Sequence, residues 1–185
     1  MLTNPLGQSE LAVCLRSAEG VALGDVFSFL SALYFRGKLT YARACAPEAR
    51  IRVITTSRGL VSPSLAIRDH DLDEFGSVDI DVEDPRYVEP LRRTTEEFAA
   101  ALPDSTCVVL LGSIATGKYV DTLVSIFGER LLFPAEFVGR GDMSRGGLLL
   151  RHARAGTQLE YASLIRAERR GKRPAKLGKP PRRSD

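Results

Sequence analysis

A glycine-bounded loop near the middle of the chain has residue types that bind phosphate. Residues 112–119 read GSIATGKY, after the apolar run CVVLL and before a segment whose apolar residues have helical spacing. The loop differs at one position from G-x-x-x-x-G-K-[ST], in which backbone N–H groups and the lysine hold phosphates and the hydroxyl holds Mg²⁺. Tyr119 occupies the hydroxyl position, which disfavours a phosphotransferase. A looser phosphate or ribose contact stays open, as does a turn whose small residues serve packing only. The candidate phosphate-binding residues are Gly112, Ser113, Thr116, Lys118 and Tyr119.

A second glycine-rich loop, GRGDMSRGG at residues 139–147, combines cations with a predicted helix start at Asp142 or Ser144. Free backbone N–H groups at the start of a helix attract anions, and arginines add to that attraction. Glu136 and Asp142 supply carboxylates for a general base or for stabilising a cationic sugar. The alternative is a flexible glycine loop without a ligand. The candidate anion-binding residues here are Gly139, Gly141, Ser144 and Arg145.

Two further stretches contribute cations and aromatic rings. Ser57, Arg58 and Gly59 follow the β-branched run 50–56, and Arg16 follows the apolar run 11–15. We assign these four residues to phosphate or nucleotide binding, because ligands of open α/β sheets lie where strands end. The aromatic residues Tyr34 and Phe35 stand beside two cations and are candidates for stacking a base. The alternative for this aromatic pair is a helix junction with a solvated basic face.

The elements that must position these residues alternate between strands and helices. Apolar runs predict strands at 11–15, 50–56, 107–111, 130–133 and 158–164. Helical periodicity predicts helices within 25–46, where Gly37 is a possible break, at 85–102, at 119–127 after Gly117-Lys118, and from a cap at Asp142 or Ser144 to about Ala155. The acidic stretch 69–84 is interpreted as a solvated loop. Alternation of this kind favours an α/β fold, a three-layer sandwich of about five mostly parallel strands with helices on both faces. The strand-end loops would then meet in one crevice.

Charge divides the chain into two parts. Residues 166–185 hold nine Lys/Arg and two Asp/Glu, whereas residues 1–165 hold 17 Lys/Arg and 21 Asp/Glu. We therefore expect a single α/β domain over residues 1–165 and a disordered basic tail over residues 166–185. The tail would attract nucleic acid by releasing counterions, or it would only keep the protein in solution.

Composition predicts a cytoplasmic protein without a membrane span, metal or cofactor. The chain has no apolar run of about 18 residues, and its N-terminus MLTNPLGQSE lacks the pattern of an export signal. The three cysteines are odd in number and lie in or beside apolar segments, which favours reduced thiols. Zinc is not expected, because there are two histidines and no C-x-x-C motif.

The order of these motifs resembles a family of small bacterial α/β domains of unknown function. The resemblance covers residues 11–150 and is carried by LAVCLRS, YFRGKLTYARA, TTSRGLVSP, VVLLGSIATGKY and LFPAEFVGRGDMSRGG. Such domains look related to accessory domains of archaeal tRNA base-exchange and base-modifying enzymes, and to the uracil-DNA-glycosylase-like fold. The resemblance implies a nucleic-acid base or nucleotide as ligand and N-glycosidic chemistry. The chain lacks the G-Q-D-P-Y motif with which uracil-DNA glycosylases activate water.

These observations leave three functions open. The favoured one is an enzyme acting on a nucleic acid or nucleotide at an N-glycosidic bond or base, with Glu136 or Asp142 activating water or stabilising the sugar cation. The second is a non-catalytic module that binds phosphate or nucleic acid through the same residues. The third, disfavoured by Tyr119, is a phosphotransferase.

Overall fold

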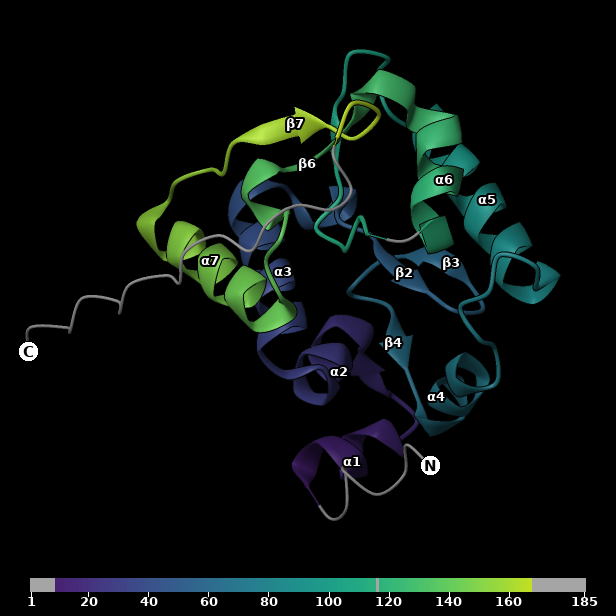
Figure 1. The fold of residues 1–185 in the computed structure, drawn as a ribbon. Coiled ribbons are helices and arrows are strands. Elements are labelled where there is room, and N and C mark those ends of the chain that lie inside the picture. The colour runs from purple at the N-terminus through teal and green to yellow at the C-terminus, as the bar shows by residue number, and fades with distance from the viewer. Residues whose placement is uncertain (1–8, 116, 168–185) are drawn as a thin grey trace, which may run out of the picture.

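The computed structural model describes residues 9–115 and 117–167 of the chain (Figure 1). Within these residues helices predominate, and the longest strand has four residues. The helices are α1 Glu10–Leu15, α2 Leu23–Leu30, α3 Ala32–Cys45, α4 Asp69–Gly76, α5 Pro85–Ala100, α6 Gly117–Phe127 and α7 Asp142–Ala155. No helix in the described ranges has both the length and the apolar character needed to cross a membrane.

The strands form three small sheets instead of one large one. In the first two, β1 Val21–Ala22 pairs with β4 Ala66–Ile67, and β2 Val53–Thr55 pairs with β3 Gly59–Val61, both antiparallel. In the third, β6 Leu131–Pro134 lies between β5 Val108–Val109, to which it is parallel, and β7 Tyr161–Ser163, to which it is antiparallel. The prediction of a three-layer α/β sandwich with about five mostly parallel strands is therefore wrong.

Part of that error comes from the segment 11–15, which forms helix α1 and not a strand. The Ser9 hydroxyl caps the helix by accepting the backbone N–H of Ala12 at 3.3 Å. Ala12 and Leu15 are buried whereas Val13 is exposed, so the buried residues repeat with helical spacing. A short apolar run does not by itself distinguish a strand from a helix, and here the cap decides.

The rest of the error comes from strand pairing. The predicted strand 50–56 supplies β2, but it folds back on β3 as a hairpin instead of pairing with a distant parallel strand. Gly59 closes this turn with a φ of +64°, and the Thr55 hydroxyl donates to the Gly59 carbonyl at 3.0 Å. A backbone in this left-handed region favours glycine. The hairpin thus ends this sheet locally, which a pattern of apolar runs does not reveal.

The acidic stretch 69–84 also differs from its prediction as a solvated loop, because its first half is helix α4. Leu72 and Phe75, three residues apart, are buried on one face of the helix. The Asp71 carboxylate accepts the backbone N–H of Arg68 at 2.7 Å and thereby caps the first turn. Two apolar residues at helical spacing and one cap were enough to order this segment.

The amphipathic helices α5, α6 and α7 confirm the sequence-based expectations closely. Asp84 caps α5 by accepting the backbone N–H of Arg86 at 2.9 Å. Pro90 lies inside α5, and the Thr94 hydroxyl donates to its carbonyl at 2.7 Å. Gly156 ends α7 in the left-handed conformation, with a φ of +64°.

The buried residues form three clusters. The largest joins α6, β6 and α7, the second joins α1, α2, β4 and α4, and a small third cluster contains Val78, Tyr87 and Leu91. Figure 1 shows α3 and α7 running side by side on one flank and α5 beside α6 on the other. The cavity described below lies between these helices.

Two glycines set the close approach of α3 to α7. A Cβ placed on Gly37 would lie 2.8 Å from the Gly146 carbonyl oxygen, and one placed on Gly146 would lie 2.8 Å from the Leu33 carbonyl oxygen. The predicted break within 25–46 therefore lies at Ser31, between α2 and α3, and Gly37 serves helix packing instead.

We expect Gly37→Ala to destabilise the protein by about 1–2 kcal/mol. Overpacking against the α7 backbone costs about 1–3 kcal/mol, and the better helix propensity of alanine returns at most about 1 kcal/mol. Urea denaturation followed by circular dichroism measures the change. Thr40→Ala is the control, because it places alanine at an exposed position of the same helix. Equal stability of Gly37→Ala and wild type would contradict the proposed contact.

Candidate ligand-binding site

Helix α3 and the loops that precede α6 and α7 bring several predicted residues together. The Tyr34 hydroxyl donates to the Leu111 carbonyl at 3.3 Å, and the Tyr34 ring lies edge-on to Phe137 with 6.5 Å between centroids. The Tyr119 hydroxyl donates to the Ser113 carbonyl at 2.7 Å. Burial raises the pKa of Tyr34 to about 12, against the opposing effect of the nearby Arg145. Burial likewise raises the pKa of Tyr119, again near Arg145.

Arg145 is the buried cation of this cluster, with 8% of its surface exposed. Its Nε and one terminal nitrogen donate to the Phe137 carbonyl at 3.2 and 3.1 Å, and its other terminal nitrogen lies 3.4 Å from the Asp142 carboxylate. The guanidinium carbon is 5.5 Å from the centre of the Phe137 ring. Arg145 therefore fixes the start of α7 on the 3₁₀ turn Ala135–Phe137.

Both predicted catalytic carboxylates contact arginines. Glu136 lies 3.4 Å from a terminal nitrogen of Arg140, which also donates through Nε to the Glu136 carbonyl at 2.9 Å. Asp142 pairs with Arg145, and its side chain is 68% exposed. The carboxylates therefore neutralise neighbouring cations at the surface of this loop.

Lys38 lies one turn beyond Tyr34 on α3, and its ammonium group is placed against aromatic rings. Its Nζ lies 4.4 Å from the centroid of Tyr34 and 5.4 Å from that of Phe35. Among the described residues, no carboxylate forms an ion pair with Lys38. Burial lowers the pKa of Lys38, the Asp142 carboxylate acts in the opposite direction, and the Arg145 guanidinium lowers it further.

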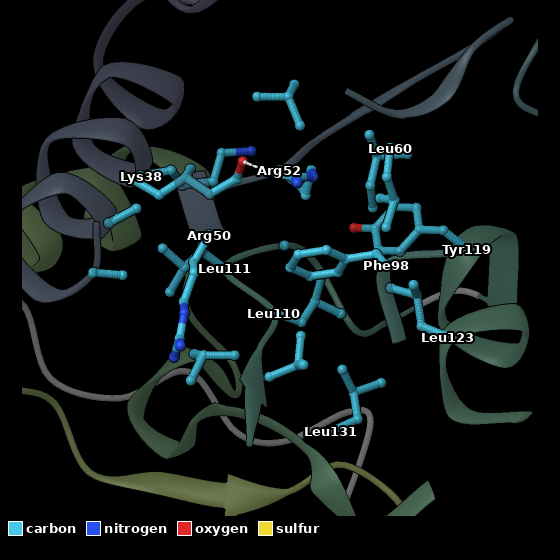
Figure 2. Close-up of a pocket in the computed structure, with 18 of the residues that line it drawn as sticks. Lys38, Arg50, Arg52, Leu60, Phe98, Leu110, Leu111, Tyr119, Leu123 and Leu131 are labelled. Atoms are coloured by element: carbon cyan, nitrogen blue, oxygen red, sulfur yellow. Dashed lines mark hydrogen bonds between the residues drawn. The ribbon is translucent and has the colours of Figure 1, made fainter. Parts of the chain in front are cut away.

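A cavity of about 610 Å³ adjoins this cluster, and Lys38, Gly112 and Tyr119 belong to its wall. Residues of α2, α3, β2, β3, α5, β5, α6, β6 and β7, and of the turns between these elements, complete the wall. Figure 2 shows the basic side chains Lys38 and Arg50 toward one side, Tyr119 and Leu123 toward the other, and Arg52 between them. The described wall contains these three cations and no aspartate or glutamate.

The two arginines of the wall differ in how far they are already engaged. Arg52 donates to the carbonyls of Ala49 and Ile51 at 2.9 and 2.8 Å, and its guanidinium carbon lies 4.6 Å from the centre of the Phe98 ring. Arg50 is exposed and forms no ion pair with another described residue. Arg50 is therefore the cation whose charge is most available to a ligand.

One polar group of the wall lacks a partner. The Tyr87 hydroxyl is buried without a hydrogen bond from any described residue. Burial, followed by the proximity of Tyr119, raises its pKa to about 12. A buried hydroxyl without a partner is unfavourable by about 1–3 kcal/mol, so a ligand that donates to it or accepts from it would remove that penalty.

Residues 57–59, predicted to bind phosphate, have other contacts. Arg58 forms ion pairs with Asp71 and Glu74 of α4, and the Ser57 hydroxyl donates to Glu74 at 2.6 Å. Gly59 lies tightly against Pro90 of α5. The carboxylates of α4 thus occupy the positions around Arg58 that a phosphate would need.

The remaining predicted residues do not all gather in one crevice. Arg16 is exposed at the end of α1, at the opposite end of the molecule from α6 (Figure 1). Phe35 packs on Phe27 with 5.5 Å between centroids, and Lys118 is exposed.

Gly139 has a φ of +71° and Gly141 is the N-cap of α7. Arg140 contacts the Ser144 hydroxyl at 3.4 Å, and a Cβ on Gly112 would lie 2.7 Å from the Tyr119 hydroxyl. Thr116 and most of the basic tail lie outside the described residues.

Sequence reasoning did not select Arg50, Arg52 or Tyr87. The two arginines alternate with Ile51 and Val53 in the run RIRV, and this alternation was the available signal. Tyr87 carried no signal beyond its place on the apolar face of α5. Within the described residues there is no group of three or more His, Cys, Asp or Glu side chains placed to hold a metal ion.

Comparison with known proteins does not assign the site. No model of a protein family matches the chain, and no curated protein or solved structure matches it. The resemblance to small bacterial α/β domains therefore stays a prediction, and the site is interpreted from its own geometry.

We expect Arg58→Gln to destabilise the protein by about 1–3 kcal/mol at pH 7, because it leaves the largely buried Asp71 without its cation. Arg58 lowers the pKa of Glu74 foremost through its hydrogen bond, and for Asp71 the Arg68 N–H and Arg58 outweigh the opposing effect of burial. Carboxylates with lowered pKa values stabilise the fold above the unfolded-state pKa of about 4 and lose that effect as the pH falls through the folded-state values.

Urea denaturation of wild type and Arg58→Gln between pH 7 and pH 2.5 measures this difference. The two stabilities should converge at the acidic end. A gap that stays constant over this range would show that the ion pairs are not its cause. Arg16→Gln is the matched control, since Arg16 is exposed and forms no ion pair with a described residue.

We expect Tyr87→Phe to leave the free protein as stable as wild type or up to about 1 kcal/mol more stable, because the variant removes an unpaired buried hydroxyl. Tyr119→Phe is the comparison, because the Tyr119 hydroxyl does have a partner in the Ser113 carbonyl, and its loss should destabilise by about 1 kcal/mol. Thermal unfolding of both variants measures the contrast. A clearly destabilised Tyr87→Phe would mean that the hydroxyl has a partner in solution.

Proposed function

We propose that the protein binds a small anionic ligand with a flat apolar part in this cavity, and that a mononucleotide is a ligand of this class. One observation carries the proposal: the described residues of the wall include Lys38, Arg50 and Arg52 but no carboxylate. Opposite charges attract more strongly where water is partly excluded, and like charges gathered in one wall lack an internal counterion. A bound anion would supply that counterion.

The size and the lining of the cavity support a ligand of nucleotide size. Small-molecule sites occupy about 300–1,000 Å³ and are mostly apolar with a few polar groups, and this cavity has about 610 Å³. Phe98 and Tyr119 offer aromatic surface to a base. Stacking on an aromatic side chain contributes about 1–3 kcal/mol per base.

The distribution of charge in the wall gives the ligand an orientation. Lys38 and Arg50 lie on the opposite side of the view from Tyr119 and Leu123, and Arg52 lies between them against Phe98 (Figure 2). A phosphate would contact Arg50 and Lys38, and the base would lie against Phe98 and Tyr119. Arginine suits a phosphate because its planar guanidinium donates two parallel hydrogen bonds.

Binding is favoured over N-glycosidic chemistry as the function of this cavity. Glu136 and Asp142, the carboxylates proposed for that chemistry, do not belong to the cavity wall. Each of them pairs with an arginine of its own loop. A catalytic carboxylate must reach the reacting atoms, so we place ligand binding first and glycosidic cleavage second.

Isothermal titration with AMP and with adenosine tests the proposal. We expect AMP to bind at least about tenfold more tightly, a difference of about 1.4 kcal/mol, because only AMP carries a charge for the cations. Arg50→Gln should remove most of this preference. Arg16→Gln is the matched control, since it makes the same change of charge at the far end of the molecule and should preserve it. Equal binding of AMP and adenosine, or preference retained in Arg50→Gln, would contradict the proposal.

A further inference from the structure

We propose that Lys38 is a nucleophilic amine that forms an imine with the carbonyl group of an anionic aldehyde or ketone held in the cavity. The inference rests on the proposed function, because the same cavity binds the ligand. It goes further by naming a reacting group on the protein and a carbonyl on the ligand.

The first argument is the position of the amine. Lys38 is partly buried and belongs to the cavity wall. Its Nζ lies against the rings of Tyr34 and Phe35, at 4.4 and 5.4 Å from their centroids. It forms no ion pair with a described carboxylate. The rings are cation–π partners of the ammonium, so Lys38 lies in the cavity wall with aromatic contacts and without, among the described residues, the carboxylate partner that a buried lysine normally has.

The second argument is the charge around the amine. Burial, the largest effect, lowers the pKa of Lys38, Arg145 lowers it further, and Asp142 opposes both. Arg145 and Asp142 come from α7, and Tyr34, with a pKa raised to about 12, is neutral near pH 7. A desolvated lysine close to another cation is the arrangement that makes an amine available as a nucleophile. The arrangement therefore favours a larger neutral fraction than an exposed lysine has.

The third argument is that the same wall carries a second cation for the anionic part of the ligand. In Figure 2 Arg50 lies on the same side of the view as Lys38 with its guanidinium end turned away from Lys38, so the anion and the carbonyl of the ligand would occupy different places. An anion held by Arg50 would keep the ligand bound while its carbonyl meets Nζ. Such positioning replaces a bimolecular encounter with a step within one complex.

The step balances without a further reactant. The nitrogen lone pair of neutral Lys38 attacks the carbonyl carbon, a C–N bond forms, and the carbonyl oxygen takes up the proton that leaves the nitrogen. The resulting carbinolamine loses this oxygen as water and becomes the imine. Borohydride then delivers a hydride to the imine carbon and makes the link a stable secondary amine.

Reductive trapping on the full chain tests the inference. The protein is incubated at pH 7 with 4-carboxybenzaldehyde and, in parallel, with uncharged benzaldehyde, then reduced with sodium borohydride and mapped by peptide mass spectrometry. The chain has five lysines, at positions 38, 118, 172, 176 and 179. We expect labelling of Lys38 by the charged aldehyde to exceed that of each other lysine at least tenfold, and the excess to shrink as the pH approaches 10. Label at Lys118 and the tail lysines without enrichment at Lys38 would overturn the inference.

Variants and competition separate this inference from the proposed function. Lys38→Arg should abolish the enriched label and Lys118→Arg should not. Circular dichroism checks that both variants fold. If Lys38→Arg does not fold, the distribution of label over the lysines of the wild-type protein tests the inference alone. Bound AMP should reduce the aldehyde labelling of Lys38 in proportion to the fraction of cavities that AMP occupies. If AMP binds as proposed but Lys38 is not enriched, the imine is refuted and the binding function stands. If Lys38 is enriched but AMP neither binds nor protects it, the amine stands and the nucleotide is refuted.

Discussion

The close contact of α3 with α7 is the constraint on which the candidate site depends. Gly37 and Gly146 let the two backbones approach to a distance that a Cβ would prevent. This approach places Tyr34 and Lys38 of α3 beside Arg145 of α7. Side chains on two packed helices are positioned more rigidly than side chains on a loop. The electrostatic environment of Lys38 is therefore a property of helix packing.

The helices were largely predictable and the sheets were not, for a physical reason. The apolar face of α5 repeats over four turns within Pro85–Ala100, and α7 ends at Gly156, so the local sequence determines both. A strand is stabilised by hydrogen bonds to a second strand, and its own sequence does not identify that second strand. The segment 50–56 therefore predicted β2 but not its hairpin with β3, and the run 11–15 predicted a strand where Ser9 caps a helix.

The candidate site was predictable in part. The glycine loops pointed to the starts of α6 and α7, and the structure places Tyr119 and Arg145 of these regions near Tyr34. The ion-pair partners of Arg58 were not predicted, because Asp71 and Glu74 lie in a stretch that was interpreted as a solvated loop. The cavity could not be predicted either, since nine α-helices and strands contribute to its described wall and no single run of residues encodes it.

The strands β2 and β5 both line the cavity but belong to different sheets. In the described ranges β2 pairs only with β3 and β5 pairs only with β6, yet both β2 and β5 contribute to the wall. A change in the separation of these two strands breaks no hydrogen bond of a β-ladder. Regions joined by side-chain contacts alone open at a lower free energy than regions joined by a ladder. The width of the cavity can therefore change without the loss of a ladder hydrogen bond between these two strands.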